Sequence, residues 1–189
     1  MEKEIHKEQI YSSTILEFVT IAVEFCAFLE KEQSLDRNEW ISKMLIILPL
    51  MYVKASMLPE YEFDDEISLE NFVKEEDYAR VLNTVANILD EEDVYLDVFM
   101  EEMKYSDTPI SSTVSEDVAD IYQDVRNFVS VYQYGIEESM IESIAVCSRN
   151  FKSFWGQRLV NTLRPLHTIM YSQNDLTSED SKQGDNFWT

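Results

Sequence analysis

Glycine, proline and cysteine are all scarce in this chain. Its 189 residues include three glycines, four prolines and two cysteines. Glycine and proline mark most tight turns, so their scarcity predicts long elements joined by few loops. No Cys-x-x-Cys pair occurs, which excludes the redox and zinc motifs built on that spacing. Cys26 and Cys147 both fall among apolar neighbours, and we expect them to be small buried hydrophobic side chains.

Long apolar runs are also absent. The longest uncharged one covers ten residues, 44–53, whereas a membrane-spanning helix needs about 20. The N-terminus begins Met-Glu-Lys-Glu and has no apolar stretch of the kind found in signal peptides. The sequence therefore favours a cytoplasmic protein with no membrane segment.

Basic residues are few, with 15 Lys and Arg against 37 Asp and Glu, which gives a net charge of −22. This charge argues against binding to nucleic acid or to an anionic membrane surface, because both require cations on the protein. The charge is unevenly distributed: residues 60–124 hold 21 acids and 3 bases, whereas residues 125–171 hold 3 acids and 5 bases. Residues 60–124 are thus expected either to bind a basic protein partner or to form a solubilising surface.

Apolar residues recur at helical spacing along most of the chain, and we see no competing strand pattern. Helices are predicted over 15–31, 36–58, 75–90, 96–103, 113–134 and 136–171. Asp36 and Thr113 are predicted N-caps, each followed by a glutamate three residues on, and Gly135 is a predicted helix stop. Pro49 and Pro165 predict kinks. The expected fold is an all-α, single-domain bundle of about six helices.

The helical domain is expected to cover residues 15–171. Residues 1–14 would be an extension or the start of the first helix, and residues 172–189 a polar tail. The first helix is apolar nearly all round, so we expect it at the core together with residues 151–163. Gly156 lies inside the last helix at a cost of about 1 kcal/mol relative to alanine, which suggests that another helix or a ligand approaches it closely.

No motif assigns a catalytic, cofactor-binding or metal-ligating residue. Neither His6 nor His167 has a glutamate three positions before it, so the Glu-x-x-His pairs of di-iron bundles are absent. The chain has no Gly-x-Ser-x-Gly elbow and no glycine-rich phosphate loop. These features favour a protein that is not an enzyme.

Two rows of acids fall on single helix faces, namely Asp117, Asp120 and Asp124, and Asp93, Asp97 and Glu101. Carboxylates at helical spacing are the ligands by which all-α nucleotide pyrophosphohydrolases hold Mg²⁺. Such pairs also arise by chance among 37 acids. Because both rows lie opposite the apolar faces, we expect them to be solvated. The alternative is a Mg²⁺-dependent phosphohydrolase that uses Asp90, Asp93, Asp117 and Asp120.

Five strings of the sequence resemble a family of small, all-helical bacterial proteins known as domain of unknown function 5063. They are EFCAFLE (24–30), LPLMYVKASMLP (48–59), YLDVFMEEMKYSDTPIS (95–111), SEDVADIYQDV (115–125) and FWGQRLVNTL (154–163). The resemblance spans about residues 15–171 and implies an all-α fold. It implies no activity and gives no residue a role.

Our leading hypothesis is a non-enzymatic interaction module in which residues 60–124 meet a basic or amphipathic protein. The Mg²⁺-dependent phosphohydrolase is one alternative, and an acidic mimic of nucleic acid is another. The sequence leaves the oligomeric state open.

Overall fold

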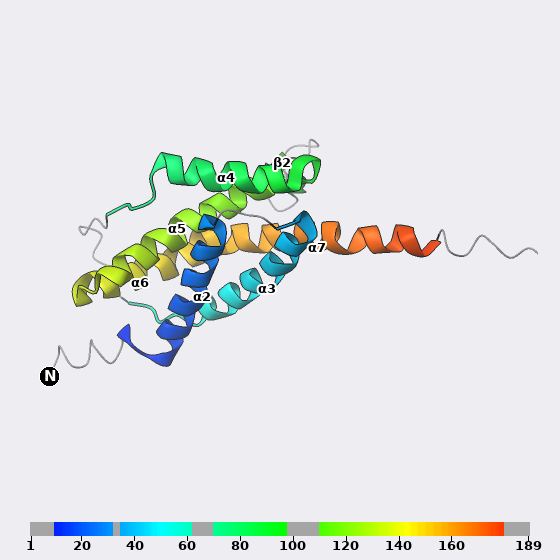
Figure 1. Ribbon diagram of the computed structural model, residues 1–189. Helices are drawn as coiled ribbons and strands as arrows, with labels where there is room; N and C mark the ends of the chain where they lie inside the picture. Colours follow the sequence, from blue (N-terminus) through cyan, green and yellow to red (C-terminus); the bar gives the residue numbers. More distant parts are fainter. Residues whose placement is uncertain (1–9, 32–34, 62–69, 98–109, 180–189) are drawn as a thin grey trace, which may run out of the picture.

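The structure, a computed structural model, describes residues 10–31, 35–61, 70–97 and 110–179. Its α-helices are α2 (Ser13–Glu30), α3 (Arg37–Ser56), α4 (Glu75–Leu89), α5 (Val114–Tyr134), α6 (Glu137–Asn150) and α7 (Gly156–Glu179). A π-helical turn, η3 (Phe151–Trp155), joins α6 to α7 without a break, so the described chain forms five helical rods (Figure 1). The all-α, single-domain fold is thereby confirmed.

Three helix boundaries follow from local chemistry and lie where the sequence predicts them. The Asp36 carboxylate accepts a hydrogen bond from the backbone N–H of Asn38 at 2.7 Å and so begins α3. The Thr113 hydroxyl accepts one from the N–H of Glu116 at 3.3 Å and begins α5. Gly135 ends α5 with a φ of 73°, a left-handed conformation that costs glycine little because it has no Cβ.

A short hairpin corrects one predicted element. After the 3₁₀ turn η1 (Asp90–Asp93), strand β1 (Val94–Asp97) pairs antiparallel with β2 (Ile110–Thr113), and Val94 lies opposite Thr113. The helix predicted over 96–103 is therefore wrong at its start, and its remainder falls largely outside the described residues. Strand β2 begins in the segment between the helices predicted over 96–103 and 113–134. Tyr95 explains the difference, because its hydroxyl bonds to Asp117 of α5, a tertiary contact that helical spacing does not reveal.

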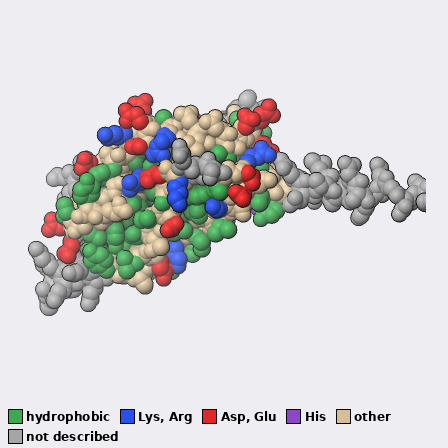
Figure 2. All heavy atoms as spheres, viewed as in Figure 1, with side chains coloured by type: hydrophobic (Ala, Val, Ile, Leu, Met, Phe, Trp, Pro, Cys, Tyr) green, Lys and Arg blue, Asp and Glu red, His purple; other side chains and the backbone are tan. Residues whose placement is uncertain are grey.

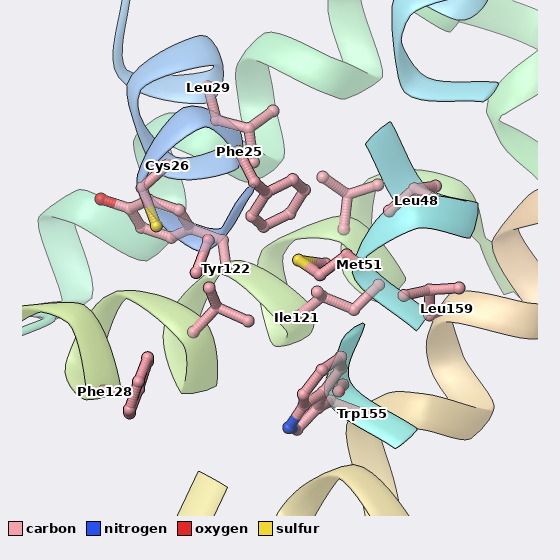
Figure 3. Close-up of a cluster of buried hydrophobic side chains, with 14 of the residues drawn as sticks. Phe25, Cys26, Leu29, Leu48, Met51, Ile121, Tyr122, Phe128, Trp155 and Leu159 are labelled. Carbon is pink, nitrogen blue, oxygen red and sulfur yellow. The ribbon is translucent and has the colours of Figure 1, made fainter. Parts of the chain in front are cut away.

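Helix α5 is the most extensively buried of the described helices, and the first helix, α2, contributes six buried residues to the core as predicted. More than half of the 21 residues of α5 are buried, and it packs against α2, α4, α6 and α7. By contrast, α2 buries one face, while Leu16 on another face is 43% exposed. One face of residues 151–163 lies in the core, where Trp155 and Leu159 are fully buried beside side chains of α2, α3 and α5 (Figure 3), whereas Phe154 and Val160 are 41% and 46% exposed.

The apolar run at 44–53 belongs to α3, which is apolar on two faces. Met44, Leu48 and Met51 are buried, whereas Ile46, Leu50 and Val53 on the other side are 60%, 47% and 50% exposed. Helix α3 continues past Pro49, and α7 continues past Pro165 to Glu179, beyond the predicted end at Tyr171. The kinks expected at the two prolines stay predictions. No helix in the described ranges is long and apolar enough to cross a membrane.

The π turn explains Gly156. The Gly156 N–H bonds to the Phe151 carbonyl five residues earlier, and a Cβ at Gly156 would lie 2.3 Å from that carbonyl oxygen and 2.9 Å from the Phe151 ring. The atoms nearest to such a Cβ thus belong to the turn itself. The π geometry within its own helix therefore accounts for the glycine without the close approach of another helix, and the approach of a ligand stays a prediction.

We expect Gly156→Ala to destabilise the protein although alanine is the better helix former. The clash with the Phe151 carbonyl should cost about 1–3 kcal/mol, as other overpacked sites do, and outweigh the gain of about 1 kcal/mol in helix propensity. Urea denaturation measures the difference. Gln157→Ala at the next, exposed position is the control and should be neutral or slightly stabilising. A stabilised Gly156→Ala protein would contradict the steric explanation.

Candidate functional site

Asp117 is fully buried, which contradicts the expected solvated row. It lies on α5, where its carboxylate accepts hydrogen bonds from the Tyr95 hydroxyl of β1 and, at 2.9 Å, from the Arg158 guanidinium of α7. Burial raises the pKa of Asp117, and the bonds from Tyr95 and Arg158 oppose that rise. The prediction failed because α7 packs against this side of α5 and supplies a cation to it.

The other two members of the row are also engaged. Asp120 accepts a hydrogen bond from the Tyr78 hydroxyl of α4 at 2.9 Å, and its other oxygen lies 3.5 Å from Nε of Arg158. Asp124 accepts a bond from the side-chain amide of Asn150 at 2.6 Å. Burial and the neighbouring Asp120 raise the pKa of Tyr78. The row is therefore a structural network that ties α4, β1, α6 and α7 to α5.

In the second predicted row, the structure describes only the side chain of Asp93, whose burial contradicts the expected solvation. Asp93 is buried, and its two oxygens accept bonds from the backbone N–H and the hydroxyl of Ser115 at 2.8 and 2.6 Å. Asp97 lies in β1, and the side chains of Asp97 and Glu101 fall outside the described residues. Asp90 is exposed at the end of α4.

The four carboxylates proposed as Mg²⁺ ligands do not form a site together. The oxygens of Asp93 are taken by Ser115, and those of Asp117 by Tyr95 and Arg158. Within the part of the chain that the structure describes, no group of three or more His, Cys, Asp or Glu residues is placed to hold a metal ion. The phosphohydrolase hypothesis therefore gains no support from the geometry.

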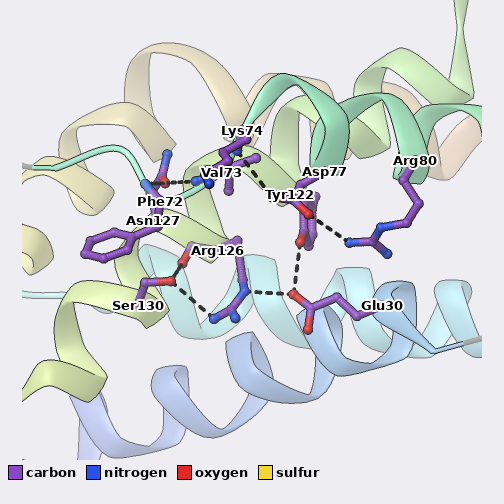
Figure 4. Close-up of polar contacts among 10 residues, drawn as sticks. All are labelled: Glu30, Phe72, Val73, Lys74, Asp77, Arg80, Tyr122, Arg126, Asn127 and Ser130. Atoms are coloured by element: carbon purple, nitrogen blue, oxygen red, sulfur yellow. Dashed lines mark hydrogen bonds and ion pairs between the residues drawn. The ribbon is translucent and has the colours of Figure 1, made fainter.

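A groove on another side of α5 is the better candidate site (Figure 4). One hollow of about 510 Å³ is lined by Glu30, Phe72, Val73, Asp77, Arg80, Tyr122, Arg126 and Ser130. A second hollow of about 350 Å³ is lined by Phe72, Arg126, Ser130, Gln133 and Tyr134, so it shares three of these residues. We call the two together the α4–α5 groove. Its walls come from the end of α2, the segment before α4, α4 itself and α5.

Polar groups in the groove are held in place by one another. Arg126 Nε lies 2.7 Å from Glu30 Oε1, and Arg126 NH1 donates to the Ser130 hydroxyl at 3.2 Å. The Tyr122 hydroxyl donates to the same Glu30 oxygen at 2.9 Å. Burial, together with Glu30, raises the pKa of Tyr122 to about 12, so the phenol stays a donor at neutral pH. Arg80 is held more loosely, 3.4 Å from Asp77.

The wall formed by residues 72 and 73 is anchored to α5. The Asn127 side-chain oxygen accepts hydrogen bonds from the backbone N–H groups of both Phe72 and Val73, at 2.8 and 3.0 Å. The Phe72 ring also contacts the Tyr134 ring, with centroids 5.3 Å apart. These contacts fix an aromatic pair at one end of the groove.

Sequence reasoning missed this groove because its residues come from three distant segments. One signal was present: Tyr122, Arg126 and Ser130 recur at i, i+4 and i+8 and so mark one side of α5 with polar groups. Tyr122 also belongs to the apolar residues that repeat at helical spacing along this helix. Its polar hydroxyl was therefore not grouped with Arg126 and Ser130.

The two cysteines are confirmed as buried side chains. Cys26 and Cys147 are both free thiols, 3% and 2% exposed. Burial raises the pKa of both, so neither is an activated thiolate at neutral pH.

The fold and the groove can now be compared with known proteins. The model of the family described as a domain of unknown function (DUF5063) matches residues 9–172. The chain belongs to this family. Among solved structures, protein BF1032 from Bacteroides fragilis is 45% identical, with a TM-score of 0.76, over 86% of this chain and 96% of that one. A comparison with curated proteins finds no match. The family resemblance noted in the sequence is thus confirmed, and a protein from a bacterium shares the fold.

We expect Arg158→Met to destabilise the protein by about 3 kcal/mol. This is the lower end of the cost of removing one partner from a buried ion pair, since Arg158 itself is partly exposed while Asp117 is buried. Adding Asp117→Asn should recover much of the loss, because the buried charge is then gone. Chemical denaturation of both single variants and the double variant measures the coupling. Arg164→Met, at an exposed position of α7, is the control, and simple additivity of the two changes would contradict the pairing.

Asp124 gives a pH prediction. Burial raises its pKa above the ordinary 3.8, and the bond from Asn150 opposes the rise. The folded protein therefore holds this proton more tightly than the unfolded chain, and stability is lost as the pH rises through the folded pKa. Asp124→Asn should be more stable than the wild type at pH 7, and the difference should shrink as the pH falls towards 3.8. Thermal unfolding across this range tests it, with exposed Gln123→Asn as the control. A difference that does not change with pH would contradict the prediction.

Proposed function

We propose that the protein is a non-enzymatic interaction module that binds a basic protein along the acidic edge formed by α4. The observation that carries the proposal is a set of exposed carboxylates at both ends of this helix. They are Glu70, Glu75 and Glu76 near its start, and Asp90, Glu91 and Glu116 near its end. Figure 2 shows acidic side chains gathered at the two ends of this edge.

These six side chains differ from the other acids of residues 60–124. Several of the others face a cation within the fold, as Asp117 does with Arg158, Glu60 with Lys152 and Glu92 with Arg37. The six exposed ones lie within 4 Å of no Lys or Arg nitrogen among the described residues. Uncompensated carboxylates on a protein of net charge −22 attract a basic partner and speed its association.

The spacing of the acids favours a protein partner over mimicry of nucleic acid. Helix α4 has 15 residues and is thus about 22 Å long, so the two acidic groups are well separated. The exposed positions between them are Arg80, Asn83 and Asn87, which interrupt any phosphate-like row. This arrangement fits a protein partner with two separate basic patches. It fits less well the continuous basic surface of a DNA-binding protein, which a nucleic-acid mimic would occupy.

Affinity purification from a native lysate at low salt tests the proposal. The wild type should retain a specific basic protein, and Glu75→Gln combined with Glu76→Gln and Glu91→Gln should lose most of it. Glu137→Gln with Glu138→Gln is the matched control, because these residues also lie in the first turn of a helix and their neutralisation has a similar cost in helix stability. Equal retention by both variants, or no specific partner, would overturn the proposal.

A further inference from the structure

The α4–α5 groove is lined by equal numbers of acidic and basic side chains. Two carboxylates, Glu30 and Asp77, and two guanidinium groups, Arg80 and Arg126, line the same hollow. Its formal charge is therefore zero in a protein of net charge −22. We infer that this groove binds a small zwitterion with an aromatic group, such as an aromatic amino acid. This inference is independent of the acidic edge of α4.

Charge complementarity selects the zwitterion. A simple anion is repelled by the net charge of the protein, whereas a simple cation is attracted by it but makes no use of the two guanidinium groups in the groove. A molecule with one ammonium and one carboxylate has no net charge, and each of its ends finds an opposite charge. Its ammonium would lie near Glu30 or Asp77 and its carboxylate near Arg126 or Arg80.

The charged groups are oriented and retain bonding capacity. Both contacts described for the Glu30 carboxylate, from Tyr122 and Arg126, go to Oε1. Those described for the Arg126 side chain use Nε and NH1. Hence Glu30 Oε2 and Arg126 NH2 have capacity for a ligand, and both side chains are about one-third exposed, at 33% and 30%. Prior orientation lowers the entropic cost of binding.

An aromatic pair supplies the apolar part of the site. The Phe72 and Tyr134 rings contact each other where the second hollow adjoins the first, and Tyr134 is 70% exposed. A flat ring of a ligand can pack against them in an offset or edge-to-face geometry. The hollows of about 510 and 350 Å³ are of the size that small-molecule sites have.

Isothermal titration calorimetry with L-tryptophan on the full-length protein tests the inference. Three comparison ligands separate the contributions: indole-3-propionate lacks the ammonium, tryptamine lacks the carboxylate, and L-leucine lacks the aromatic ring. We expect L-tryptophan to bind at least about tenfold more tightly than each of the three, because each loses one kind of contact.

Two exposed residues allow variants that should leave the fold intact. Tyr134→Ala removes the exposed ring, and Arg80→Gln removes the loosely held cation; each should weaken L-tryptophan binding at least about fivefold. Tyr171→Ala and Arg164→Gln, which change an exposed tyrosine and an exposed arginine of α7, are the matched controls and should bind as the wild type does.

Three outcomes would overturn the inference. One is no measurable heat with L-tryptophan up to about 10 mM, which is above the millimolar Kd of weak ligands. The second is equal binding of tryptamine or indole-3-propionate, which would show that one charge suffices. The third is equal loss in the groove variants and their controls. Under the first outcome the contact between Glu30 and Arg126 serves only to pin α2 to α5.

Discussion

The ion pair between Asp117 and Arg158 joins α7 to α5 at a carboxylate that has no exposed surface. A carboxylate with no exposed surface is tolerated only where donors replace the water that it has lost. Arg158 and Tyr95 do so, and Arg158 also reaches Asp120, which in turn accepts a bond from Tyr78. One guanidinium group thus joins the last helix, the hairpin, α4 and α5. The desolvation of the pair offsets much of its attraction, so its net contribution to stability is small compared with the cost of removing one partner.

Some of the unevenly distributed charges of the sequence pair with one another in the fold. The acidic residues 60–124 and the mildly basic residues 125–171 contact each other in the fold, through Asp117 with Arg158 and Glu60 with Lys152. Part of the charge contrast therefore serves intramolecular recognition, in which two segments of opposite sign select one arrangement. Among the described residues of 60–124, the exposed carboxylates at the two ends of α4 do not take part in such pairs.

The sequence predicted those features that depend on neighbours along the chain. The caps at Asp36 and Thr113, the stop at Gly135 and the position of Trp155 in the core all follow from spacing and local hydrogen bonding. Sequence-based prediction failed where a contact with a residue far away in the sequence determines the local structure or the burial of a side chain. Tyr95 lies in a strand because it bonds to Asp117, and Asp117 is buried because α7 brings Arg158 to it. Gly156 was recognised as unusual, but its cause is a π turn that the helical period cannot show.

The groove escaped prediction for a related reason, which lies in the position of its residues on α5. At about 100° per residue, the row of Asp117, Asp120 and Asp124 and the row of Tyr122, Arg126 and Ser130 lie on roughly opposite sides of the helix. Helical periodicity detects one apolar stripe and treats polar residues outside it as solvated, so it separates neither row from ordinary surface. In the fold, the first row is covered by other elements and its acids all have donors. The second row borders an open hollow with oriented charges of both signs. Tyr122 and Arg126 of the second row also bond to Glu30 and so join α2 to α5. A change at either residue therefore alters the packing of α2 as well as the groove, whereas a change at the exposed Arg80 or Tyr134 alters the groove without removing a buried side chain.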